Sequence, residues 1–90
     1  MQYLIVNLKT GYQAMVHNPV RVDRGTPWGN PFILGVDGDR AEVCRLFEAY
    51  ATWRLCLQSH WLDHLRARDL ACWCAPEQCH AETLMRLANR

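Results

Sequence analysis

Two short apolar runs lie near opposite ends of the chain, and between them hydrophobic residues recur at helical spacing. Residues 3–8 (YLIVNL) and 69–74 (DLACWC) lack the alternation of a strand with one solvated face, and such runs are typical of strands buried on both faces. A weaker strand is expected at residues 20–22. Strands that alternate with helices favour a parallel or mixed sheet. We therefore expect an α/β fold, a small single domain over residues 1–90 with a short sheet covered by two or three helices.

The clearest helix is predicted at residues 39–57. Asp39 can cap its amino end, and a glutamate three residues later completes a pattern similar to a capping box. A short second helix is predicted at residues 60–66. A last helix is predicted from Pro76 to about Ala88, because proline suits the first turn of a helix.

Composition and charge exclude several classes of protein. The 90 residues are 50% hydrophobic with a formal net charge of +1, which argues against a disordered chain and against a nucleic-acid partner. No apolar run approaches the roughly 18 residues that span a bilayer, and the start MQYLIVNLKT lacks the features of a signal peptide. We expect a cytoplasmic protein with no membrane partner, whose five cysteines are free thiols or metal ligands rather than disulfides.

Residues 24–38 combine turn-forming residues with aromatic side chains and hold four of the five glycines. An aromatic ring here can stack on a planar ligand, an asparagine amide can bond the edge of a base, and an arginine can contact a phosphate. A glycine lets another group approach the main chain closely. The alternative is that the rings anchor the loop in the core and the asparagine bonds its own backbone. The candidate ligand-binding residues of this loop are Arg24, Trp28, Gly29, Asn30 and Phe32.

Four side chains able to bind metal or react with a ligand cluster near the carboxyl end: Cys72, Cys74, Cys79 and His80. Thiolates and imidazole are zinc ligands, although the C-x-C-x4-C-H spacing differs from that of common zinc sites. In a second interpretation, Cys79 and His80 lie in the first turn of the last helix, where free N–H groups attract anions. There Cys79 can act as a nucleophile and His80 can carry its proton. In a third, the cysteines only pack in the core.

Two blocks, RGTPWGNPF (24–32) and DLACWCAPEQCHAETL (69–84), with a helix start near Asp39 between them, resemble the DUF4326 family of small bacterial and phage proteins. This resemblance implies no activity, because the family is a domain of unknown function. The Cys-His block is also similar, more weakly, to that of the DUF488 family, which suggests kinship with α/β folds that handle nucleotides. Ala81 stands where the DUF4326 block often has glycine, which would alter a close backbone contact with a ligand.

We expect a small-molecule binding module for a nucleotide or nucleotide-like ligand, with a pocket between the 24–32 loop and the start of the last helix. Its ligand-binding residues would be those of the loop together with Cys74, Cys79 and His80. In a phage setting such a protein could sequester a signalling nucleotide. The alternative is a small hydrolase or transferase acting on a phosphoester or N-glycosidic bond, with Cys79 and His80 as catalytic residues.

A second alternative is a zinc-stabilised interaction module in which Cys72, Cys74, Cys79 and His80 hold the metal; otherwise no cofactor is expected. Separately, an aromatic helical face could join two copies in a homodimer. This face comprises Tyr50, Trp53 and Trp61.

Overall fold

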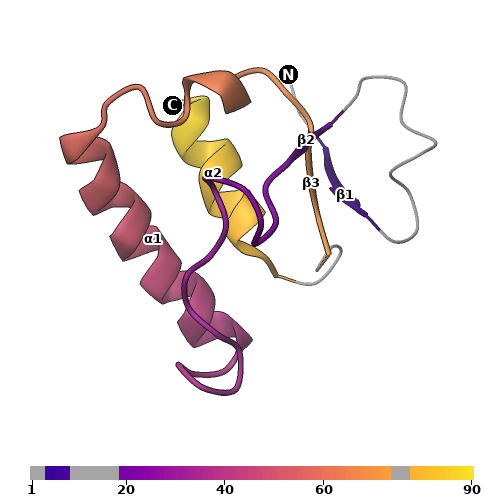
Figure 1. Cartoon of the computed structure of the whole chain (residues 1–90), viewed down its shortest axis with the longest axis vertical. Coiled ribbons are helices and arrows are strands. Elements are labelled where there is room, and N and C mark those ends of the chain that lie inside the picture. Colours follow the sequence, from indigo (N-terminus) through magenta and orange to yellow (C-terminus); the bar gives the residue numbers. More distant parts are fainter. Residues whose placement is uncertain (1–3, 9–18, 74–77) are drawn as a thin grey trace.

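The computed structural model describes residues 4–8, 19–73 and 78–90 (Figure 1). The described elements, in chain order, are β1 (Ile5–Asn7), β2 (Val20–Arg21), α1 (Arg40–Leu57), the 3₁₀ helix Asp63–Leu65, β3 (Leu70–Cys72) and α2 (His80–Ala88). None of these helices combines the length and the apolar character needed to cross a membrane.

The strands form one parallel sheet in the order β1-β3-β2. Leu70 of the central strand β3 pairs with Ile5 of β1 on one side and with Val20 of β2 on the other. Every residue of β3 is buried, as its apolar sequence predicts. The structure thus confirms a small α/β fold, with a sheet that is parallel between all of its described strands.

Helix α1 occupies the predicted segment. Asp39 is its N-cap, and the Asp39 carboxylate accepts a hydrogen bond from the backbone N–H of Glu42 (2.9 Å). The periodic apolar residues bury one face of the helix, with Phe47 and Ala51 fully shielded from solvent. The helix ends at Leu57, where the sequence pattern places its end.

The prediction for residues 60–66 is wrong, because this segment forms only the 3₁₀ helix Asp63–Leu65. The chain leaves the helical conformation at Arg66, whose ψ is 133°, and Ala67 then adopts a positive φ of 59°. Leu62 and Leu65 are buried. Apolar burial therefore holds the segment, which is too short to sustain a helix by itself.

The predicted start of the last helix is also wrong. Helix α2 begins at His80, and Cys79 is its N-cap in an extended conformation (φ −147°, ψ 152°). Cys79 therefore lies before the first turn and not within it. The extended backbone lets the buried Cys79 side chain reach Cys72 at the end of β3. Pro76, the predicted first residue of this helix, lies outside the described residues.

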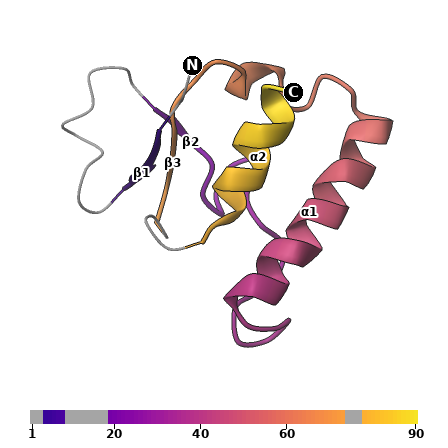
Figure 2. The same cartoon turned by 180° about the vertical axis from the view of Figure 1, so that it is seen from behind.

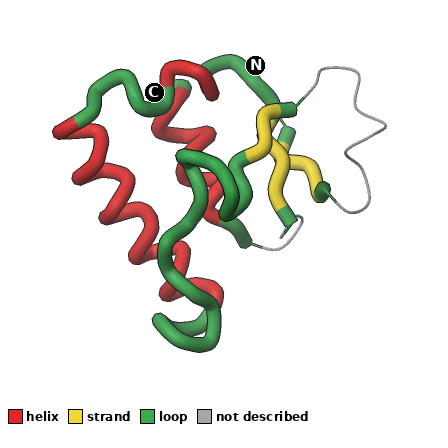
Figure 3. Tube along the Cα trace, viewed as in Figure 1, coloured by secondary structure: helices red, strands yellow, loops and turns green. Residues whose placement is uncertain are grey.

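Helix α2 lies between the sheet and α1 in both views of the molecule (Figure 1, Figure 2). This position explains why most of α2 is buried, including its polar residues His80 and Thr83. The largest fully buried side chains of the core are Phe47, Leu65, Leu70, Leu84, Val22 and Cys72. Figure 3 shows the long loop after β2 running past α2 to the amino end of α1.

Candidate functional site

A cavity of about 220 Å³ lies beyond the carboxyl ends of β2 and β3. Asp23 and Arg24, which follow β2, and Trp73, which follows β3, line it together with the first residues of α1 and α2, Arg40 and His80. Open parallel sheets commonly bind their ligands at this edge. We call this space the strand-end cavity.

The structure brings together five of the candidate residues from the two sequence blocks. Arg24, Asn30 and Phe32 of the loop line the strand-end cavity, and so do Cys79 and His80. Trp28 and Gly29 are not among the lining residues. Cys74 lies outside the described residues.

Seven further residues line the cavity without having been singled out from the sequence: Asp23, Leu34, Arg40, Val43, Cys44, Trp73 and Gln78. Asp23 carries a signal that points to this edge, because it follows the predicted strand at residues 20–22. Trp73 lies within the predicted strand at residues 69–74 and follows β3 only because β3 ends at Cys72. Arg40 opens the predicted helix α1. No local pattern distinguishes the apolar members from ordinary core residues.

Trp28 anchors the loop to the 3₁₀ segment. Its indole Nε1–H donates to the Trp61 carbonyl oxygen (2.9 Å), and its ring stacks on His64 with centroids 5.7 Å apart. The Trp61 indole in turn donates to the Pro27 carbonyl oxygen (3.2 Å). These contacts favour the structural interpretation of Trp28 over stacking on a ligand.

Gly29 accommodates the chain's own backbone. A Cβ at this position would lie 2.8 Å from the Arg24 Cα and 3.0 Å from the Asp23 carbonyl oxygen. The Gly29 N–H donates to the Thr26 carbonyl oxygen (3.2 Å), which closes the turn. The close approach expected of this glycine thus occurs within the loop, and it sets the position of Arg24 beside the cavity.

Asn30 and Phe32 form one wall. The Asn30 side-chain oxygen accepts a hydrogen bond from the Phe32 backbone N–H (2.9 Å), the local bond typical of turn asparagines. The Phe32 ring meets Tyr50 edge-on, with centroids 6.2 Å apart. The wall is therefore fixed by contacts within the protein while its inner side faces the cavity.

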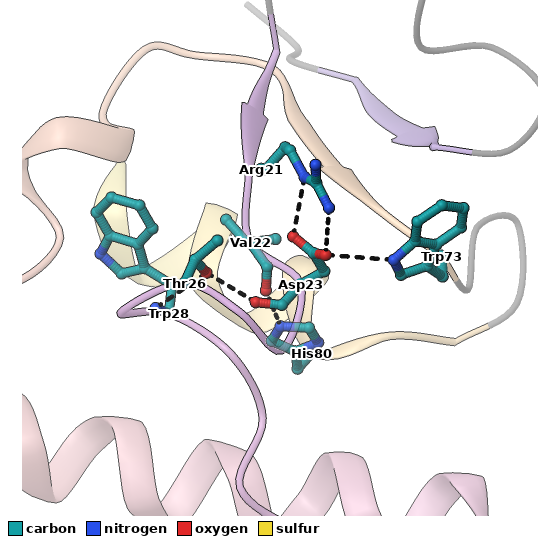
Figure 4. Close-up of polar contacts among 7 residues, drawn as sticks. All are labelled: Arg21, Val22, Asp23, Thr26, Trp28, Trp73 and His80. Atoms are coloured by element: carbon teal, nitrogen blue, oxygen red, sulfur yellow. Dashed lines mark hydrogen bonds and ion pairs between the residues drawn. The ribbon is translucent and has the colours of Figure 1, made fainter.

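The carboxylate of Asp23 links the segment after β2 to the segment after β3 (Figure 4). The Asp23 carboxylate accepts hydrogen bonds from the Arg21 guanidinium (2.6 and 3.2 Å) and from the Trp73 indole N–H (3.2 Å). The bonds from Arg21 lower the pKa of the Asp23 carboxyl below its usual value, and burial opposes them only in part. Trp73 is thereby held by its edge, while 56% of its surface stays exposed.

Two cationic side chains reach the cavity from different elements. Arg24 donates to the Phe32 carbonyl oxygen (3.4 Å), and Arg40 donates to the Gln78 carbonyl oxygen (3.2 Å). Guanidinium groups keep their charge at any physiological pH. Arg21 is paired with Asp23, and Arg24 and Arg40 bring two positive charges to the wall of the cavity.

His80 lines the cavity, and a hydrogen bond fixes its tautomer with the proton on Nε2. Its Nε2–H donates to the Val22 carbonyl oxygen (2.7 Å; Figure 4). Burial lowers the pKa of His80 below 6.5, although the bond to Val22 acts in the opposite direction. Burial thus favours the neutral imidazole, in which a proton on Nε2 leaves a lone pair on Nδ1.

Cys79 lies between this lone pair and a second thiol. The Cys79 Sγ is 3.5 Å from the His80 Nδ1 and 2.9 Å from the Cys72 Sγ. Within residues 4–8, 19–73 and 78–90, no group of three or more His, Cys, Asp or Glu side chains is arranged to hold a metal ion. The proposed zinc set includes Cys74, which lies outside those ranges.

The comparisons with known proteins give a family and no function. The family model described as "Domain of unknown function (DUF4326)" matches residues 6–90. No curated protein and no solved structure matches the chain. The match covers both sequence blocks and every residue of the strand-end cavity, and on this basis the chain belongs to the DUF4326 family.

Proposed function

We propose that the strand-end cavity binds a nucleotide or a nucleotide-like small anion. The observation that carries the proposal is that Arg24 and Arg40 line the same cavity as the rings of Phe32 and Trp73. Guanidinium groups bind phosphate through charge-assisted hydrogen bonds, and exposed aromatic faces stack on bases.

The size of the cavity limits the ligand. At about 220 Å³ it is smaller than the roughly 300–1,000 Å³ that is typical of sites for drug-sized molecules. It suits a base or a phosphorylated ribose, with the remainder of a mononucleotide resting on the exposed face of Trp73. A dinucleotide would extend into solvent.

Native mass spectrometry of the protein purified without chelator tests for a retained ligand. A mass excess equal to a mononucleotide supports the proposal. An excess equal to one zinc ion per chain, removed by a chelator, would instead support the zinc-stabilised interaction module. The same spectrum reports whether the chain is a monomer or the homodimer expected from its aromatic face.

Calorimetric titration with mononucleotides, the matching nucleosides and inorganic phosphate tests the binding chemistry. A mononucleotide should bind more tightly than either of its parts. Arg24→Gln and Arg40→Gln should each weaken binding by about tenfold or more, because a charge-assisted hydrogen bond contributes about 1.5–3 kcal/mol.

Arg45→Gln is the matched control for these variants. Arg45 lies on α1, pairs with Glu42 and is not a lining residue. Its loss removes the same charge without touching the cavity. Equal weakening by Arg45→Gln and Arg40→Gln would show that only net charge matters, and absence of binding by any phosphate compound would overturn the proposal.

We infer, as a second candidate, a hydrolase or transferase acting on a phosphoester or N-glycosidic bond. It rests on the Cys79 Sγ lying 3.5 Å from the His80 Nδ1 while Val22 holds the opposite nitrogen. In this reaction the Cys79 thiol gives its proton to His80, the sulfur attacks the reacting phosphorus or anomeric carbon, and the bond to the leaving group breaks as that group takes the proton from His80. Water, or the acceptor in a transferase, then gives its proton to His80 and displaces the sulfur, which takes this proton and is restored as the thiol.

Incubation of each bound mononucleotide with wild type and with Cys79→Ser, followed by chromatography of the products, tests this candidate. Cleavage by wild type that Cys79→Ser abolishes supports it. Binding without turnover, or cleavage that persists in Cys79→Ser, removes Cys79 as a nucleophile and leaves the binding function unaffected.

A further inference from the structure

Two buried thiols meet at the junction of β3 and α2. Cys72 is the last residue of β3 and Cys79 is the N-cap of α2, and their sulfur atoms are 2.9 Å apart. Cys79 also lines the strand-end cavity. One residue of this close pair of thiols therefore borders the cavity, and the other is not a lining residue.

We propose that Cys72 and Cys79 are a redox-active pair, which a peroxide entering the strand-end cavity converts to an intramolecular disulfide. The proposal is independent of the nucleotide site, because it needs only the two sulfur atoms, a proton acceptor and a path for a small oxidant.

The positions of the two sulfur atoms already approach those of a bond. A disulfide has a sulfur–sulfur distance of about 2.05 Å, so the sulfur atoms must approach by less than ~1 Å. No hydrogen bond from the Cys79 side chain caps α2, so the thiol can react without uncapping the helix.

His80 supplies the proton acceptor. Its Nε2 is bonded to Val22, and its Nδ1 faces the Cys79 sulfur at 3.5 Å. The amino end of α2 also stabilises negative charge that develops on a residue at the N-cap. These two groups assist the loss of the Cys79 proton as the sulfur attacks an oxidant, although the thiol is buried.

The proposed reaction has two steps. Cys79 gives its proton to His80 and its sulfur attacks one peroxide oxygen; the O–O bond breaks, Cys79 becomes a sulfenic acid, and the other oxygen leaves as water with the proton from His80. The Cys72 sulfur then attacks the Cys79 sulfur, the S–O bond breaks, and a second water leaves with the Cys72 proton. Two electrons pass from the thiols to the peroxide, and an external thiol reverses the reaction.

The disulfide would form directly beside two residues that line the cavity. Trp73 follows Cys72, Gln78 precedes Cys79, and both line the strand-end cavity. Oxidation of the pair would therefore fix part of the cavity wall covalently.

The test is to treat the full chain with hydrogen peroxide, alkylate the remaining thiols and measure the intact mass. Oxidised wild type should take up two fewer alkyl groups than the reduced protein. Its mass should be that of a single chain, which shows that the new bond lies within one molecule. Glu77 separates Cys79 from both other cysteines of the cluster, and Trp73 separates Cys72 from Cys74. Cleavage at these two residues therefore assigns the bonded pair by peptide mass.

Single substitutions test which two cysteines form the disulfide. Cys72→Ala and Cys79→Ser should each abolish the two-thiol loss, whereas Cys74→Ser should retain it; circular dichroism checks that each variant is folded. His80→Gln should still form the disulfide, but at a rate lower by about a hundredfold or more, because the proton acceptor is gone. A bond involving Cys74, a bond between chains, or thiols that react only in denaturant would overturn the proposal.

Discussion

The indole groups of Trp28 and Trp61 bind each other's segments reciprocally: Trp28 donates to the Trp61 carbonyl oxygen at 2.9 Å, and Trp61 donates to the carbonyl oxygen of Pro27, the residue before Trp28. This double contact fixes the middle of the loop, and Arg24, Asn30 and Phe32 on either side of it line the strand-end cavity. Arg54 completes the junction with its guanidinium 4.3 Å from the centre of the Trp61 ring.

Trp28→Phe should therefore lower the free energy of unfolding by about 1 kcal/mol, because the ring is retained while the hydrogen bond to Trp61 is lost. Urea denaturation measures the change. Trp53→Phe is the control, since Trp53 is 59% exposed, and it should change stability by less than about 0.5 kcal/mol. Equal effects of the two substitutions would contradict the anchoring role of Trp28.

Gly29→Ala should destabilise the protein by about 1–3 kcal/mol, the usual cost of overpacking. The added Cβ would meet the Arg24 Cα at 2.8 Å, and this contact is with backbone that cannot rotate away. Gly25→Ala is the control, because it adds the same methyl group to the same loop at a position where the new Cβ would have no atom within 4 Å. Thermal melting of both variants should show a loss at Gly29 only.

Stability should decrease as the pH falls below about 6.5, the ordinary pKa of histidine. Burial lowers the pKa of His80 in the folded state, so between the folded and unfolded pKa values the unfolded chain binds more protons. The free energy of unfolding then rises with pH and reaches its full value above the unfolded pKa. Melting temperatures measured from about pH 7.5 to 5.5 record this slope.

His80→Gln provides the comparison for the pH series. Glutamine can still donate to the Val22 carbonyl oxygen but does not titrate. The variant should lose the part of the slope that His80 contributes. An unchanged slope in His80→Gln would show that a different group controls the acid sensitivity.

Trp73→Ala should weaken mononucleotide binding by about tenfold, since stacking of a base on an aromatic ring contributes about 1–3 kcal/mol. Trp73→Phe keeps a flat ring but loses the bond to Asp23, so its affinity should fall between those of wild type and Trp73→Ala. Titration calorimetry gives all three values. If Trp73→Ala binds as wild type does, the base does not rest on this ring.

The edge of the sheet at which the cavity lies follows from the order of the sequence elements. Parallel strands place their carboxyl ends together, which is why Arg24 and His80, far apart in the chain, line the same cavity. This part of the prediction needed only the apolar runs, the weaker strand at residues 20–22 and the helix pattern.

The orientation of individual side chains did not follow from the sequence. Trp28 and Phe32 lie in the same loop and have similar chemistry, yet Trp28 is bonded to Trp61 while Phe32 faces the cavity. What separates them is a contact with residues more than thirty positions later in the chain. Arg40 was missed for the same reason, because only the tertiary fold brings the start of α1 next to Gln78.

The pairing of Ile5 with Leu70 has a consequence for the order in which this protein can form during synthesis. Strand β3 lies between β1 and β2 in the sheet but follows both of them in the chain. Neither β1 nor β2 therefore has a described partner strand until residues 70–72 have left the ribosome. Contacts of such long sequence separation slow folding, because the intervening chain must be ordered first. The sheet, and with it the edge that bears the cavity, is therefore completed only after β3 has been synthesised.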